Sequence, residues 1–312
     1  MNFQQLEYAI AVHQHQHFGK AAEHCNITQA TLSAMIKKLE GELEFSLFDR
    51  SKHPIKTTEL GIQFMLMASE ALRQRTSMLS LKASDPTELE GSLTIGIIPT
   101  IANSLLPIIL PAIIEENPKL ELTVSEITTE NIKEQLAKDQ IDLGILATPL
   151  EDDSLDETIL YYEPMMIYGI DNQDKNYVTS KDIQGRKVWL LEEGHCFRQQ
   201  SLTICNIQEK QLHDNHLNMK ANSFETLLNL TDKFGGYTLV PELYFNDLPK
   251  NRQRKTKGFQ KPLPVREVSI VSHRPLAKRK SIDLLSRRIH ELVTPLLSTE
   301  KMKAKDLAII GI

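Results

Sequence analysis

Long apolar runs are missing from this sequence of 312 residues, and no stretch approaches the roughly 18–20 apolar residues that cross a bilayer. The N-terminus, MNFQQLEYAIAVHQHQH, also lacks the basic head and apolar core of a signal peptide. Both absences argue against a membrane or exported protein and favour the cytoplasm, where thiols are kept reduced. An excess of positive charge is lacking too, because 36 Lys and Arg face 41 Asp and Glu. Any surface for nucleic acid must therefore be local.

The composition that remains is that of an ordinary globular protein. Hydrophobic residues make up 41% and charged residues 25% of the chain. The length is sufficient for two or three domains with a sizeable core.

A two-helix pattern near the N-terminus is the first local signal. The segment 18–25 predicts a short helix with small residues for close packing, and 26–28 predicts a turn. Thr28 is placed to cap the next helix through its hydroxyl. That helix, over 29–43, has apolar residues at the spacing of a buried face: Leu32, Ile36, Leu39 and Leu43.

A different face of the same helix is wholly polar. Gln29, Ser33 and Lys37 lie four residues apart and therefore share this face. Their amide, hydroxyl and ammonium groups are of the kinds that contact base edges and phosphates, and two short helices with a tight turn describe a helix-turn-helix. The alternative is a solvated helix face without a partner.

Clustered charge favours the first interpretation. Residues 1–60 hold six Lys and Arg against seven Asp and Glu, so total charge does not decide. The loop RSKHPIK, from Arg50 to Lys56, nevertheless concentrates three cations and one histidine around a proline. That composition is typical of a wing that grips phosphate.

The pattern AAEHCNITQATLSAMIKKLEGELEFSLFDR…TTELG resembles the winged helix-turn-helix of LysR-type transcriptional regulators. The resemblance implies binding to double-stranded promoter DNA, pairing of a long helix after Thr58 with its copy in a second subunit, assembly as a dimer of dimers, and contact with RNA polymerase. The candidate DNA-binding residues are Thr28, Gln29, Thr31, Ser33, Lys37, Arg50, Lys52 and Lys56. Cys25 falls where this family has a core aliphatic residue, and we interpret it as a small buried hydrophobe.

A strand–helix alternation begins after residue 91. Strands are expected at 92–98, 120–124 and 142–147, with helices over about 99–117 and 129–138 between them, which predicts a parallel sheet flanked by helices. Ligands of such sheets bind at the carboxyl ends of the strands. Thr100 and Thr129 each follow a strand at the start of a helix, where they are either ligand-binding residues or plain helix caps.

A second unit of similar type follows, and a late strand and helix are expected at 265–273 and 278–297. The resemblance implies an α/β effector domain of two Rossmann-like subdomains, like that of periplasmic binding proteins, behind an N-terminal all-α winged helix-turn-helix and a long linker helix. The expected boundaries are 1–60 for the DNA-binding domain, 58–83 for the linker helix, 84–91 for a hinge, 92–161 with 268–300 for subdomain I, 162–267 for subdomain II, and 301–312 for a tail without an assigned role.

Two of the three cysteines, Cys196 and Cys205, lie nine residues apart in LLEEGHCFRQQSLTIC. No CxxC or HxxxH pair accompanies them, so no metal site is expected. A permanent disulfide is disfavoured in a reducing compartment. Core packing is the plain alternative. His195, Arg198 and an expected helix start should favour the thiolate of Cys196, whereas Cys205 has apolar neighbours and should stay protonated. One activated and one quiet thiol describe an attacking and a resolving cysteine.

This stretch is similar to the redox loop of the peroxide-sensing branch of the LysR family. The resemblance implies that hydrogen peroxide oxidises Cys196 and that Cys205 is its disulfide partner. It also implies a peroxide pocket formed by Thr100, Thr129, His195 and Arg274, without cofactor or metal. We therefore predict a peroxide-responsive transcription regulator rather than an enzyme. A LysR-type regulator of a small metabolite and a thiol peroxidase are the alternatives.

Overall fold

The computed structural model describes residues 1–80, 88–170, 177–183, 185–192, 196–206, 221–273 and 279–311. Contacts between these residues divide the chain into two units, of which the first contains residues 1–80 and the second contains 88–273 and 279–311.

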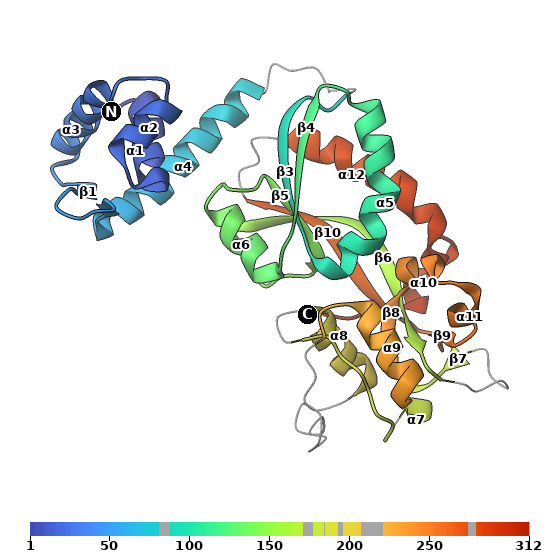
Figure 1. The fold of residues 1–312 in the computed structure, drawn as a ribbon. Coiled ribbons are helices and arrows are strands. Elements are labelled where there is room, and N and C mark those ends of the chain that lie inside the picture. The colour runs from blue at the N-terminus through green and yellow to red at the C-terminus, as the bar shows by residue number, and fades with distance from the viewer. Residues whose placement is uncertain are drawn as a thin grey trace. The chain divides into compact units, whose positions relative to one another are not determined.

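Three helices and a two-stranded hairpin make up most of the first unit (Figure 1). They are α1 (Phe3–His15), α2 (Phe18–His24), α3 (Gln29–Leu43), β1 (Phe48–Asp49) and β2 (Lys56–Thr57). The side chain of Thr28 accepts a hydrogen bond from the backbone N–H of Thr31, so the predicted cap of α3 is confirmed. The apolar face of α3 packs into the core of this unit through Leu32, Ile36 and Leu39, and Cys25 lies half-buried at its edge.

The long helix α4 (Glu59–Ser80) follows the hairpin. The apolar residues along it differ in exposure. Phe64 packs against the core of the first unit, whereas Leu60 and Met67 are 53% and 73% exposed. The predicted end of this helix (81–83) and residues 84–87 of the predicted hinge lie outside the described residues.

A nine-stranded mixed sheet organises the second unit, in the order β4-β3-β5-β10-β6-β9-β7, with β11 on β10 and β8 on β6. In sequence order the strands are β3 (Gly91–Ile97), β4 (Leu120–Glu126), β5 (Leu143–Thr148), β6 (Leu155–Tyr168), β7 (Tyr177–Val178), β8 (Thr238–Pro241), β9 (Thr256–Phe259), β10 (Leu263–His273) and β11 (Leu307–Ile309). The predicted parallel arrangement holds for β3, β4 and β5, whereas β10 runs antiparallel to both β5 and β6.

Two long strands connect the two halves of this sheet. β6 pairs with β10 from Leu155 to Pro164, and from Met165 to Tyr168 it pairs with β8. We call the half with β3, β4 and β5 lobe I and the half with β7, β8 and β9 lobe II. β6 passes without a break through the boundary expected at residue 161, so one continuous strand belongs to both lobes.

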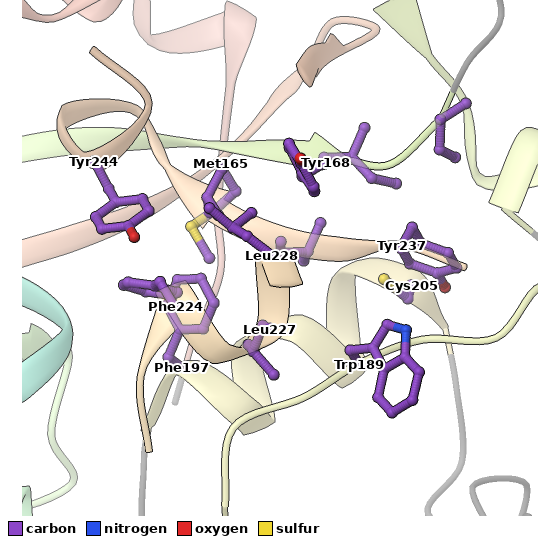
Figure 2. Close-up of a cluster of buried hydrophobic side chains, with 14 of the residues drawn as sticks. Met165, Tyr168, Trp189, Phe197, Cys205, Phe224, Leu227, Leu228, Tyr237 and Tyr244 are labelled. Atoms are coloured by element: carbon purple, nitrogen blue, oxygen red, sulfur yellow. The ribbon is translucent and has the colours of Figure 1, made fainter. Parts of the chain in front are cut away.

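Helices complete both lobes. Lobe I has α5 (Pro99–Glu116), α6 (Thr129–Ala137) and α12 (Arg279–Val293); lobe II has α7 (Ser180–Ile183), α8 (Cys196–Cys205), α9 (Phe224–Phe234), α10 (Glu242–Asp247) and α11 (Lys250–Gln253). Lobe II is built around an apolar cluster that includes Phe197, Phe224 and Trp189 (Figure 2). Among the described helices, none is both long and apolar enough to cross a bilayer.

The C-terminal tail, which had no assigned role, adds to the sheet. After three short 3-10 turns (Thr294–Leu296, Ser298–Lys301 and Ala304–Asp306) the chain enters β11, which pairs in parallel with β10. The carbonyl of Ile310 then accepts a hydrogen bond from the side chain of Gln200, in the middle of α8. The tail therefore contacts the helix that carries both cysteines of interest.

Candidate redox and nucleic-acid sites

Cys196 and Cys205 are the first and last residues of one helix, α8. Both are free thiols. Nine steps of about 1.5 Å separate their Cα atoms by roughly 13–14 Å, and nine steps of about 100° turn the side chains to opposite faces. The helix start expected at Cys196 is found. The two thiols lie at opposite ends and on opposite faces of this helix.

Thr129 is the contact partner of Cys196. The Sγ atom of Cys196 lies 2.7 Å from the Oγ1 atom of Thr129, in a hydrogen bond whose donor can be either group. Thr129 is the first residue of α6 and is buried. The helix is capped by Thr128, so the hydroxyl of Thr129 serves the thiol and not a cap.

Thr100 is connected to the cysteine helix through an arginine. The guanidinium of Arg266 donates to the hydroxyl of Thr100 at 3.2 Å and to its carbonyl at 3.0 Å. The same guanidinium lies 5.6 Å from the ring centre of Phe197, the residue after Cys196. Thr100 is buried and is not a helix cap, because the N-cap position of α5 belongs to Ile98.

Sequence reasoning missed Arg266 and its partner Glu163. Both are about 1% exposed, and Nη2 of Arg266 lies 2.7 Å from Oε2 of Glu163. Each lies in a buried stretch of strand among mostly apolar residues, in LPVREVSIV and YYEPMM. Charged residues of opposite sign in two buried strands indicate an internal ion pair, because an unpaired charge is rarely tolerated there. This was the signal that could have found them.

The prediction that Cys196 is a thiolate is wrong for the resting protein. Burial raises the pKa of Cys196, whereas the hydrogen bond with Thr129, the backbone N–H at the helix start and the charge of Arg266 lower it without cancelling the rise. Glu130 raises the pKa further. Arg198, expected to help, donates to the carbonyl of Leu191. The thiol is therefore mainly protonated at neutral pH.

The expected protonated state of Cys205 is found. Cys205 is 7% exposed, and burial raises its pKa to about 11, although the hydroxyl of Tyr237 lowers it. The remaining two predicted pocket residues, His195 and Arg274, lie outside the described residues.

The polar face of α3 is accessible in the first unit. Thr28, Gln29, Thr31 and Lys37 are exposed and Ser33 is half-buried. Burial of these residues against the unit's own core would have excluded a recognition helix, and none of them is buried there. The face is therefore available to DNA.

The predicted wing is the β1–β2 hairpin, and its three cations are exposed. Arg50 also has partners within the first unit. Arg50 donates to Oε2 of Glu40 at 2.8 Å and its guanidinium lies 5.1 Å from the ring centre of Phe18. Oε1 of Glu40 also accepts the N–H groups of Leu47 and Phe48. Glu40, another residue that the sequence analysis missed, thus ties α3 to the start of the hairpin. Lys52 lies 3.8 Å from Asp49, while Lys56 belongs to β2.

Each of the two units matches a known protein family. Residues 3–62 match the bacterial regulatory helix-turn-helix protein model of the lysR family, and residues 86–293 match the LysR substrate binding domain. The chain is 32% identical over 311 residues to the hydrogen peroxide-inducible genes activator of Dickeya chrysanthemi, covering 98% of this chain and 99% of the relative. It is 34% identical over 281 residues to the DNA-binding transcriptional dual regulator OxyR of Escherichia coli K12, covering 88% and 90%.

A solved structure gives the same result. A full-length OxyR variant from Pseudomonas aeruginosa has a TM-score of 0.75 and 27% identity, covering 93% of this chain and 98% of that one. An OxyR variant from Corynebacterium glutamicum, solved with bound hydrogen peroxide, has a TM-score of 0.62 and 25% identity, covering 98% of each chain.

A helix-turn-helix head joined to a two-lobed α/β domain defines a class of one-component bacterial regulators, and the chain belongs to the LysR family of transcriptional regulators. Within that family its relatives and structural neighbours include OxyR proteins, which are regulators and not enzymes.

Proposed function

We propose that the protein is a transcriptional regulator of the OxyR type, which binds promoter DNA in the cytoplasm and responds to hydrogen peroxide through Cys196. One observation carries the proposal. A cysteine at the first position of a helix lies against the hydroxyl of Thr129, and a second cysteine stands at the far end of the same helix.

The first step is oxidation of Cys196. Its sulfur attacks one oxygen of hydrogen peroxide, the O–O bond breaks, and the thiol proton leaves with the other oxygen as water, so that a sulfenic acid forms. Charge grows on the departing oxygen, and hydroxyl, imidazole and guanidinium groups are suitable donors for it. We assign Thr100, Thr129, His195 and Arg274 to this pocket. Arg266 supports the reaction indirectly, because its charge lowers the pKa of Cys196.

The second step is disulfide formation with Cys205. The thiol of Cys205 attacks the sulfenic sulfur, the S–O bond breaks, an S–S bond forms and water leaves. A disulfide requires Cα atoms within about 7 Å, whereas the intact helix separates them by roughly 13–14 Å. Since no change of side-chain rotamer closes that gap, α8 must unfold at least in part. The segment therefore has two discrete arrangements, which is what a switch requires.

DNA binding is assigned to the exposed face of α3, with Thr28, Gln29, Thr31, Ser33 and Lys37, and to Arg50, Lys52 and Lys56 of the hairpin. The exposed apolar residues of α4 support pairing with a second subunit, because a monomer rarely tolerates such a patch. We further propose a dimer of dimers. Contact with RNA polymerase stays a prediction of the family resemblance.

The experiment is to titrate purified protein with hydrogen peroxide while footprinting promoter DNA. A Cys25→Ser variant should respond like the unchanged protein, because Cys25 lies in the other unit. Cys196→Ser should not respond, and Cys205→Ala should form the sulfenic acid without the locked state. A normal peroxide response of Cys196→Ser would reject the proposal, and rapid catalytic turnover of peroxide with a thiol donor would indicate a peroxidase instead.

A further inference from the structure

The C-terminal tail reaches the middle of α8 (Figure 1). β11 pairs in parallel with β10, with Ile309 opposite Val265. The next residue, Ile310, donates its N–H to the carbonyl of Val265 at 2.9 Å. Its own carbonyl accepts a hydrogen bond from Nε2 of Gln200 at 3.2 Å. One residue of the tail thus joins β10 to the helix that carries both cysteines.

The side chain of Gln200 depends on this bond. Gln200 is fully buried, and a buried amide is costly unless it is hydrogen-bonded. Its Oε1 atom has no hydrogen-bond partner among the residues that the structure describes. The bond from Nε2 to the tail is therefore the contact that stabilises this amide in its place. Loss of the tail leaves the whole amide without a partner in the protein.

The tail is attached to a part of the sheet that does not include α8. β10, on which the tail lies, is itself paired with β5 and with β6. Just before β11, Oδ2 of Asp306 lies 3.3 Å from Nζ of Lys261. None of these contacts involves α8. The carbonyl of Ile310 therefore keeps its place when α8 changes its conformation.

The bond acts on the first turn of α8. Cys196 to Gln200 form little more than one helical turn, and an isolated turn is not stable in water. Once the residues after Gln200 unwind, this turn depends on its contacts with the rest of the second unit. These are the contacts of Cys196 with Thr129, of Phe197 with Arg266 and of Gln200 with the tail. The tail therefore opposes complete opening of the helix.

We infer that Gln200 and Ile310 form a clasp through which the C-terminal tail keeps α8 closed, and that Gln200 is a positioning residue for the disulfide switch. This inference deepens the proposed function and rests on it for the disulfide. The bond exists in the closed helix and is lost when Gln200 leaves its place, so it stabilises the dithiol form alone. Removal of the tail therefore favours opening of α8 and shifts the equilibrium toward the disulfide.

A double-mutant cycle tests the clasp. One change is Gln200→Met, which replaces the amide by an apolar side chain of similar length, and the other is truncation after Asp306, which removes β11 and Ile310. In a chain whose only cysteine is Cys205, made by Cys25→Ser and Cys196→Ser, alkylation of this buried thiol by iodoacetamide reports opening of α8. Truncation should raise the alkylation rate by a factor about three to ten times larger with Gln200 than with Gln200→Met, as one buried hydrogen bond supplies.

Thr203→Val is the matched control, because the hydroxyl of Thr203 donates to the carbonyl of Gln199 at 3.0 Å, within α8 itself. Truncation should have the same effect with and without this substitution. If the fluorescence of Trp189 in urea shows that the truncated chain does not fold, Ile310→Pro takes its place, since it removes the N–H that binds the tail to β10. An effect of the tail change that is equal with Gln200 and with Gln200→Met overturns the inference.

The thiol–disulfide equilibrium measures the effect of the clasp on the switch. In the Cys25→Ser chain, oxidised glutathione converts the thiols of Cys196 and Cys205 into the disulfide and leaves as two molecules of reduced glutathione. Truncation should raise this equilibrium constant about three- to tenfold with Gln200, and an unchanged constant contradicts the inference. If the full-length chain forms no disulfide with peroxide or glutathione while the alkylation result stands, the proposed function is wrong and the clasp remains. If the disulfide forms but the cycle shows no coupling, the clasp alone is wrong.

Discussion

The buried pair of Arg266 and Glu163 makes the strongest energetic prediction. Arg266→Met removes a guanidinium that contacts Glu163 at 2.7–2.8 Å and donates twice to Thr100. Glu163 then keeps only the N–H of Leu243, at 3.0 Å, as a partner among these contacts. Breaking a buried pair in this way costs about 3–5 kcal/mol, because one charge stays buried without compensation.

Urea unfolding monitored at Trp189 measures this cost. Trp189 is the single tryptophan of the chain and lies buried in lobe II, so its fluorescence follows the second unit. The double variant Arg266→Met with Glu163→Gln should recover about half of the lost free energy, since no charge then remains buried. Glutamine keeps an oxygen for the N–H of Leu243, which limits the new cost of the second substitution.

A second measurement links this pair to Cys196. Removing the charge of Arg266 should raise the pKa of Cys196 further, and the thiolate fraction at pH 7 falls tenfold for each pKa unit. The alkylation rate of Cys196 should therefore fall, though less than in Thr129→Val, because the hydrogen bond of Thr129 lowers the pKa more than Arg266 does. A cost below about 1 kcal/mol for Arg266→Met, or a double variant no more stable than the single one, would refute the reasoning.

Four further predictions concern other parts of the molecule. Lys37→Ala should weaken promoter binding and reduce its salt dependence by about one counterion, and an unchanged salt slope would exclude a phosphate contact. Met67→Glu should dissociate the oligomer in sedimentation at micromolar concentration, because it puts a charge on the exposed apolar part of α4. Gly236→Ala should cost more than about 2 kcal/mol in urea unfolding, since its Cβ meets a backbone oxygen at 2.4 Å. The pKa of Cys205 is about 8.5 in the unfolded chain and about 11 in the folded one, so its ionisation should lower the free energy of unfolding between about pH 8.5 and 11, by about 3 kcal/mol at most. A Cys205→Ala variant whose stability falls equally steeply over this range would contradict this.

Local elements of the first unit could be predicted well because their signals lie within a few residues. The spacing of Leu32, Ile36 and Leu39 together with the cap at Thr28 defined α3 at the observed residues. The pairing of Arg50 with Glu40 could not be predicted, because it depends on how the hairpin returns to the helix.

The cysteine site shows the same division more sharply. The helix start at Cys196 and the apolar surroundings of Cys205 were readable from neighbouring residues. The protonation state of Cys196 was not, because it depends on how deeply the folded chain buries the thiol. Arg266 is 70 residues away from Cys196, and nothing local to it marks its effect on that thiol.

By itself, the sequence determined the helices α2 to α6 and α12, the first strands, the polar face of α3 and the presence of two unlike thiols on one short segment. These features follow from periodicity, capping and neighbouring residues, which act over a few positions of the chain. Only the tertiary structure decided that the C-terminal tail reaches Gln200, and that Thr129 and Arg266 lie beside the start of α8. Such contacts join residues far apart in sequence, and packing and desolvation, which set their energies, exist only once the chain has folded.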